Sequence, residues 1–149
     1  MKKLLLLLLL TPIICIGQSK DLKKAIKRLG NVEIMNRGLD LTEDFVVFVD
    51  DPYFQGQKQT VESNWEKVFF KVGLNTSNWY VEDNTNVIDG RYKVEILAKS
   101  IIIKDADDNF NTVAIIEWSN YINGMHSTSM DRPKLARQYL IQELINSNN

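Results

Sequence analysis

Two long stretches of alternating apolar and polar residues constrain the fold of this chain most. Residues 91–104 and 109–122 place apolar side chains at nearly every second position, which is typical of strands with one buried face. The acidic segment 105–109 between them predicts a turn, so we expect one long hairpin in the C-terminal half. With the helical patterns elsewhere, the expected class is α+β: a mostly antiparallel sheet packed by about three helices.

The two faces of this expected hairpin differ. Even-numbered residues are the more apolar, and a turn centred near Asp107 would pair odd residues with odd ones, placing Lys99 opposite Glu117. The second face is charged at its base and apolar near the turn. There we predict an interaction patch made of Ile101, Ile103, Val113 and Ile115. Another subunit or a partner would cover this patch. Alternatively, the segment 31–41 of the same chain covers it.

Helical periodicity marks three segments, residues 19–29, 60–72 and 131–147. In the second, apolar residues recur at i, i+4, i+7, i+8 and i+11, so Trp65 is expected to anchor the core. The run from 44 to 50 is β-branched or aromatic between its terminal aspartates, which predicts an interior strand.

The first of these helices has a basic outer face, formed by Lys20, Lys23, Lys24, Lys27 and Arg28. Such a face suits a membrane surface or an acidic partner. A solvated face on an ordinary amphipathic helix is the simpler interpretation.

The N-terminus has the pattern of a cleavable export signal. Lys2 and Lys3 precede seven consecutive leucines, and small residues at Cys15 and Gly17 favour cleavage before Gln18. The apolar run is shorter than the ~20 residues that a membrane span needs, so we expect no stable span after cleavage. A single domain would then cover residues 18–149.

Cys15 raises the alternative of a lipid anchor, but Ile14 directly before it is larger than a lipoprotein signal requires. Cleavage after Gly17 removes the only cysteine of the chain, so no disulfide is expected. A cysteine-free exported domain is typical of a bacterial envelope. We therefore expect a periplasmic or secreted location.

The acidic turn resembles a calcium loop in part. Asp105, Asp107 and Asn109 supply oxygens at positions 1, 3 and 5, which would give a weak cation-binding turn. Phe110 stands where the loop needs glycine and Ile116 where it needs glutamate, so this is no EF-hand. A soluble acidic hairpin turn is the favoured interpretation.

Residues with catalytic chemistry are sparse. Asp50 and Asp51 end the apolar run at 44–50, and His126 is the only histidine, so a small hydrolase built on these three is one alternative. The sequence has no phosphate-binding glycine motif. We assign no catalytic residue, no cofactor and no metal.

A non-catalytic binding or accessory domain of the envelope is the favoured function. An envelope protein or a second copy of the chain is the expected partner. A carrier of a small apolar ligand, using Phe70, Trp79 and Tyr80, is a further alternative. The formal net charge of -1 becomes more negative once Lys2 and Lys3 are removed, which disfavours nucleic acid as a partner.

Overall fold

The computed structural model describes residues 20–49, 58–74, 76–81, 88–122 and 131–148. The strands are β1 (Val32–Asn36), β2 (Phe45–Val49), β3 (Thr76–Val81), β4 (Tyr92–Ile96), β5 (Ser100–Asp105) and β6 (Asn111–Trp118). The helices are a first helix over residues 20–29, α2 (Lys58–Lys71) and α3 (Asp131–Asn146), with a 3₁₀ turn, η2 (Ala106–Asp108).

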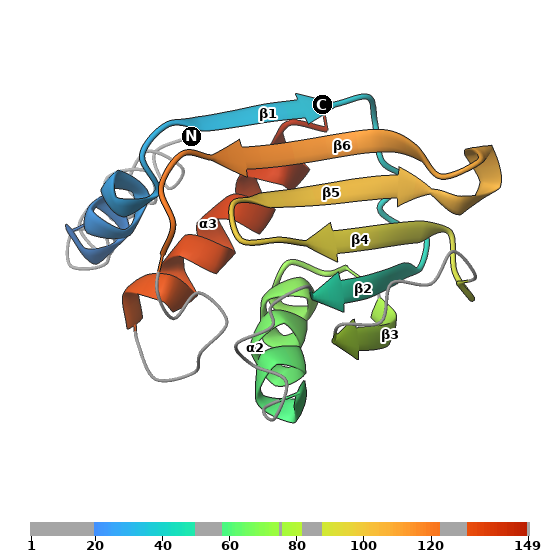
Figure 1. The fold of residues 1–149 in the computed structure, drawn as a ribbon, viewed down its shortest axis with the longest axis horizontal. Helices are drawn as coiled ribbons and strands as arrows, with labels where there is room; N and C mark the ends of the chain where they lie inside the picture. Colours follow the sequence, from blue (N-terminus) through green and yellow to red (C-terminus); the bar gives the residue numbers. More distant parts are fainter. Residues whose placement is uncertain (1–19, 50–57, 75, 82–87, 123–130, 149) are drawn as a thin grey trace, which may run out of the picture.

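The six strands form one sheet in the order β1-β6-β5-β4-β2-β3 (Figure 1). The first four strands in this order pair antiparallel, and β2 runs parallel to both of its neighbours. Residues from all three helices join one core cluster with one face of the sheet. The α+β class with a mostly antiparallel sheet is therefore confirmed.

β2 is the most deeply buried strand. Each of its residues, Phe45 to Val49, is at most 5% exposed. All five are β-branched or aromatic, which suits a strand that is packed on both faces. Its position between β4 and β3 confirms the interior strand that the apolar run predicted.

The expected first arm of the hairpin is divided into two strands. The chain turns at residues 97–99, where the N–H of Leu97 donates to the carbonyl of Ser100 at 2.8 Å. β4 and β5 then pair with Ile96 opposite Ile101. Because paired residues lie on the same face, even residues of β4 and odd residues of β5 face the helices.

β5 and β6 form the hairpin that the sequence predicted, but its register changes along its length. At the tip Asp105 pairs with Asn111, which is the expected register. A bulge then shifts the pairing by one residue, so Glu117 lies opposite Ser100 and not opposite Lys99. Beyond the bulge, odd residues of β5 pair with even residues of β6.

The segment 31–41, which was the alternative cover for the predicted patch, contributes Leu39 to the core cluster that buries Ile101 and Ile103. Its residues 32–36 extend the sheet as the edge strand β1, with Ile34 opposite Ile116 of β6. The amide of Asn36 donates to the carbonyl of Leu144 at 3.0 Å, which attaches this edge to the end of α3.

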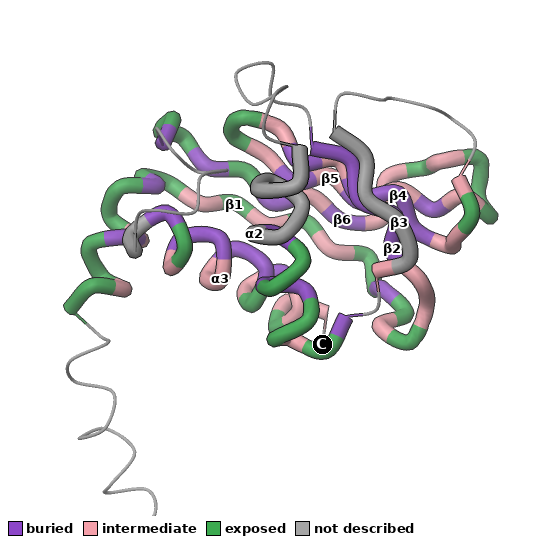
Figure 2. Tube along the Cα trace, turned by 90° about the horizontal axis from the view of Figure 1, so that it is seen from below, coloured by how far each residue is buried: buried purple, intermediate pink, exposed green. Residues whose placement is uncertain are grey.

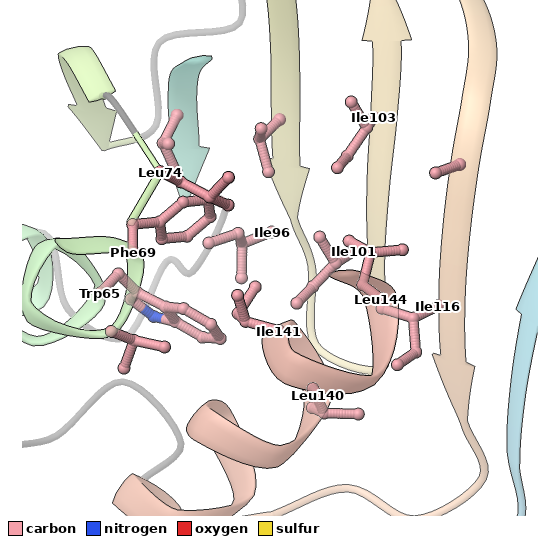
Figure 3. Close-up of a cluster of buried hydrophobic side chains, with 14 of the residues drawn as sticks. Trp65, Phe69, Leu74, Ile96, Ile101, Ile103, Ile116, Leu140, Ile141 and Leu144 are labelled. Carbon is pink, nitrogen blue, oxygen red and sulfur yellow. The ribbon is translucent and has the colours of Figure 1, made fainter. Parts of the chain in front are cut away.

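The core lies between the sheet and the helices. Trp65 and Phe69 of α2 point toward Ile141 of α3 and Ile96 of β4 (Figure 3). Trp65 is fully buried, as its place in the helical stripe predicts. The guanidinium of Arg137 lies 5.8 Å from the centre of the Trp65 ring, and burial lowers the pKa of Arg137 to about 10.

Candidate functional site

The four residues of the predicted interaction patch do not share one surface. Ile101 and Ile103 are at most 1% exposed and belong to the core beneath the helices. Val113 is half-buried and also packs against that core, whereas Ile115 is half-buried on the opposite face. The expected common face was wrong, because the turn at 97–99 reverses which residues of β5 point toward the helices.

The face of the sheet that turns away from the helices has a different apolar row. Met35 of β1, Ile115 of β6 and Ile102 of β5 are consecutive partners across three strands. None of them belongs to the core cluster, and Met35 is 37% exposed. Apolar side chains that no helix of the described part covers are a candidate contact surface. We call Met35, Ile115 and Ile102 the open-face row.

Only Ile115 of this row was in the predicted patch. Ile102 was missed because residues 97–99 contain neither glycine nor proline to mark the turn that reverses β5. Met35 lies in a strand of five residues, VEIMN, whose alternation of apolar and polar residues is too short to stand out. That alternation is the one signal that could have revealed it.

Charged residues flank the open-face row along β1. Glu33 and Glu117 lie directly opposite each other and are both exposed, so their like charges repel. Neither of them forms an ion pair with another described residue. At the other end the N–H of Arg37 donates to the carbonyl of Val113 at 2.9 Å, which continues the ladder beyond β1. By alternation Glu33 and Met35 share the open face, and Arg37 follows them at the bend that ends the strand.

Charges that pair with one another bound the row on the side of β4. Glu95, opposite Ile102, accepts a hydrogen bond from Lys104 Nζ at 3.0 Å. The Nζ of Lys93 lies 3.2 Å from the same carboxylate oxygen and 4.9 Å from the centre of the Phe48 ring. The Lys93 side chain is only 2% exposed, so this cluster is part of the packed domain and marks where the open-face row ends.

The turn predicted to bind a cation has an arginine beside it. Arg91 Nε and Nη2 donate to the two oxygens of Asp105 at 2.8 and 3.0 Å, and Nε lies 3.4 Å from Asp107. Asn109 follows η2 with a left-handed backbone, φ 54°. The guanidinium therefore supplies the positive charge next to both aspartates, and weak cation binding by Asp105, Asp107 and Asn109 stays a prediction.

A hollow of about 720 Å³ lies on the helical side, between the first helix, α2 and α3. Leu22, Val72, Leu135 and Tyr139 supply its apolar lining. Burial, helped by the charge of Glu143, raises the pKa of the Tyr139 phenol. The hollow is thus a second place where an apolar molecule could be held.

The three aromatic residues predicted for an apolar-ligand carrier do not line this hollow together. Phe70 is 83% exposed on α2, next to the lining residue Lys71. The side chains of Trp79 and Tyr80 lie outside the described part of the structure.

Several other predicted residues also lie outside the described part: Asp50, Asp51, His126 and the export segment 1–17 with Cys15. Among the residues that are described, no three His, Cys, Asp or Glu side chains are grouped to hold a metal ion. No helix in this part of the chain has the length and apolar character to cross a bilayer. The hydrolase alternative and the cleavage site therefore stay predictions.

Comparison with known proteins gives no family. No protein-family model matches the chain, and no curated protein matches it. Among solved structures, a dodecamer of a single-residue variant of PelC from Paraburkholderia phytofirmans is similar at 11% identity and a TM-score of 0.39. The similarity covers 78% of this chain and 96% of the PelC chain. A likeness at this level identifies neither a family nor a function.

Proposed function

We propose that this protein is an exported, non-catalytic binding domain of the bacterial envelope, which uses the open face of its sheet to bind a second copy of itself. The observation that carries the proposal is the order of residues along the sheet edge: acidic Glu33 and apolar Met35 on the open face of β1, then basic Arg37 at the bend directly after the strand. Glu117 beside Glu33 adds a second acidic group that no described cation neutralises.

This pattern is complementary to itself. Glu33 lies two residues before Met35, about 7 Å along the extended strand, and Arg37 lies two residues after Met35, at the bend that follows. A two-fold axis near Met35 would therefore bring the acidic end of one copy against the basic end of the other. The open-face rows of the two copies would meet at the centre, as in an isologous dimer with an apolar middle and a charged rim.

Charge exchange along β1 tests this arrangement. Sedimentation velocity of the exported, purified protein over a concentration series should show a dimer. Arg37→Glu and Glu33→Arg should each raise the Kd of that dimer about tenfold. Each change occurs twice in a symmetric contact, and tenfold corresponds to about 1.4 kcal/mol. The double variant E33R/R37E should recover the affinity, because both ends are exchanged together.

Lys67→Glu is the matched control, since Lys67 is an exposed charge on α2, which packs on the other face of the sheet. It should leave the Kd unchanged. A protein that stays monomeric throughout the series contradicts the proposal. So does a double variant that associates more weakly than either single exchange.

The export part of the proposal has its own test. Mass spectrometry of the protein isolated from its native cell should find Gln18 at the N-terminus. A product that retains Met1 would contradict export by a cleaved signal, and a lipid-modified Cys15 would replace it with an anchored form.

The hollow on the helical side favours a second candidate function, the carrying of a small apolar ligand. Its volume and its lining by Leu22, Val72, Leu135 and Tyr139 suit a molecule of lipid or metabolite size. A thermal-shift screen tests this candidate, since a ligand at 100 times its Kd adds about 2.7 kcal/mol of stability.

A further inference from the structure

The first helix presents a continuous stripe of positive charge. Lysine or arginine occurs at positions 20, 23, 24, 27 and 28, which is a spacing of i, i+3, i+4, i+7 and i+8 along one side of a helix. All five side chains are exposed, and the single acidic residue of the helix is Asp21. The cations therefore form one outward-facing array.

These cations are not used inside the domain. Among the described residues, none of the five forms an ion pair, although carboxylates are abundant elsewhere on the surface. Like charges at i, i+3 and i, i+4 destabilise a helix. A stripe of repelling charges costs stability unless an external anion compensates for it.

The body of the protein holds the helix in a fixed orientation. Ala25 and Leu29, on its inner side, are at most 1% exposed within the core cluster. The helix ends at Leu29, whose carbonyl accepts a hydrogen bond at 3.0 Å from the N–H of Asn120, two residues beyond β6. The N–H of Asn31 donates to the hydroxyl of Ser119 at 2.9 Å. The charged stripe is therefore presented rigidly.

Gly30 allows this close approach. Its φ of +76° lies in the left-handed region, and a Cβ at this position would overlap the Ser119 hydroxyl. The backbone at Gly30 can therefore lie directly against the Ser119 side chain, which follows β6.

We propose that this stripe, Lys20, Lys23, Lys24, Lys27 and Arg28, docks on an anionic bilayer surface. A row of cations along one side of a helix of about 15 Å can lie flat on a plane of anionic headgroups. An acidic protein partner would have to supply a matching row of carboxylates.

The position of the helix keeps this surface separate from the open-face row. The first helix packs on the helical side of the sheet, where buried positions line the inner side of the helices (Figure 2). The open-face row lies on the other side of the sheet. Docking on a bilayer and contact with a second copy therefore do not compete, and the two are tested independently.

Vesicle co-sedimentation of the exported, purified protein tests the proposal. The protein should bind vesicles of phosphatidylcholine with about one third phosphatidylglycerol, and binding should weaken as salt is raised. It should not bind vesicles of phosphatidylcholine alone. Each lysine near an anionic surface contributes about fivefold in affinity, so K23Q/K27Q should bind roughly 25-fold more weakly.

The matched control is K67Q/K99Q, which removes the same number of exposed positive charges elsewhere. Its affinity for the vesicles should stay within about twofold of the parent. Circular dichroism should show a thermal midpoint for K23Q/K27Q that is no lower than that of the parent, since both side chains are exposed and their removal relieves repulsion within the stripe.

Three results would overturn the proposal: no binding to the anionic vesicles, equal losses for the two lysine pairs, or binding to polyglutamate without binding to vesicles. The last would identify an acidic polypeptide as the partner of the stripe.

Discussion

Asp105 is the residue that most clearly connects two elements at the tip of the hairpin. It accepts two hydrogen bonds from Arg91, at the start of β4, and a third from the N–H of Asp107 in η2. The Arg91 guanidinium holds the pKa of Asp105 below its ordinary value, although partial burial opposes this effect. The hydrogen bonds to Asp105 in turn raise the pKa of Arg91.

Asp105→Asn should lower the thermal midpoint at pH 7, on the order of 2–5 °C. The amide loses the charge-assisted bonds to Arg91 but can still accept from Asp107. The pKa of Asp105 is lower in the folded state than in the unfolded state, where it is about 4. The stabilisation that Asp105 gives the folded state is therefore complete above pH 4 and is lost as the pH falls toward the folded-state pKa. The difference between parent and variant should therefore shrink below pH 4, measured by thermal unfolding at a series of pH values. A difference that is constant from pH 7 to pH 2 would contradict this role.

At the scale of elements, strong local patterns predicted the structure well. β2 was predicted because every position in Phe45–Val49 is β-branched or aromatic. α2 was predicted because its apolar residues follow one helical stripe, with Trp65 fully buried. Each of these patterns extends over enough residues to favour one type of secondary structure over the other.

Elements whose position depends on a single turn or bulge were not predicted. The turn at residues 97–99 has no glycine or proline, and Leu97–Ser100 hydrogen bonding closes it without a sequence signal. Period-2 patterns tell which residues share a face only within one strand. Ile101 and Ile103 were therefore predicted to lie at the surface, whereas the unmarked turn and the bulge place them in the core. Half-buried Ile102 lies on the open face instead.

Two neighbouring residues of β5 test this assignment of faces. Ile101→Thr should lower the free energy of unfolding by about 2–4 kcal/mol, because it removes buried apolar volume and adds a hydroxyl inside the core. Ile102→Thr should cost less than about 1 kcal/mol, since threonine keeps the β-branched shape on the open face. Urea unfolding at constant m-value gives both figures. Equal costs for the two variants would mean that the register of β5 is wrong.

For the whole molecule, the sheet separates two kinds of surface. On one side the three helices cover the core and present the basic stripe of the first helix. On the other side no described helix covers Met35, Ile115 and Ile102, and the charges of β1 flank them. The two proposed contacts, one with a bilayer and one with a second copy, therefore use different sides of the sheet.

A single engineered thiol tests the central claim of self-association through the open face most directly. The predicted cleavage after Gly17 would remove Cys15, so Met35→Cys would introduce the only thiol of the exported protein, close to the proposed two-fold axis. Mild oxidation at micromolar concentration should give a disulfide-linked dimer, seen on a non-reducing gel. Phe70→Cys, on the exposed surface of α2, should stay monomeric under the same conditions. Equal cross-linking of both variants, or none of Met35→Cys, would contradict the account.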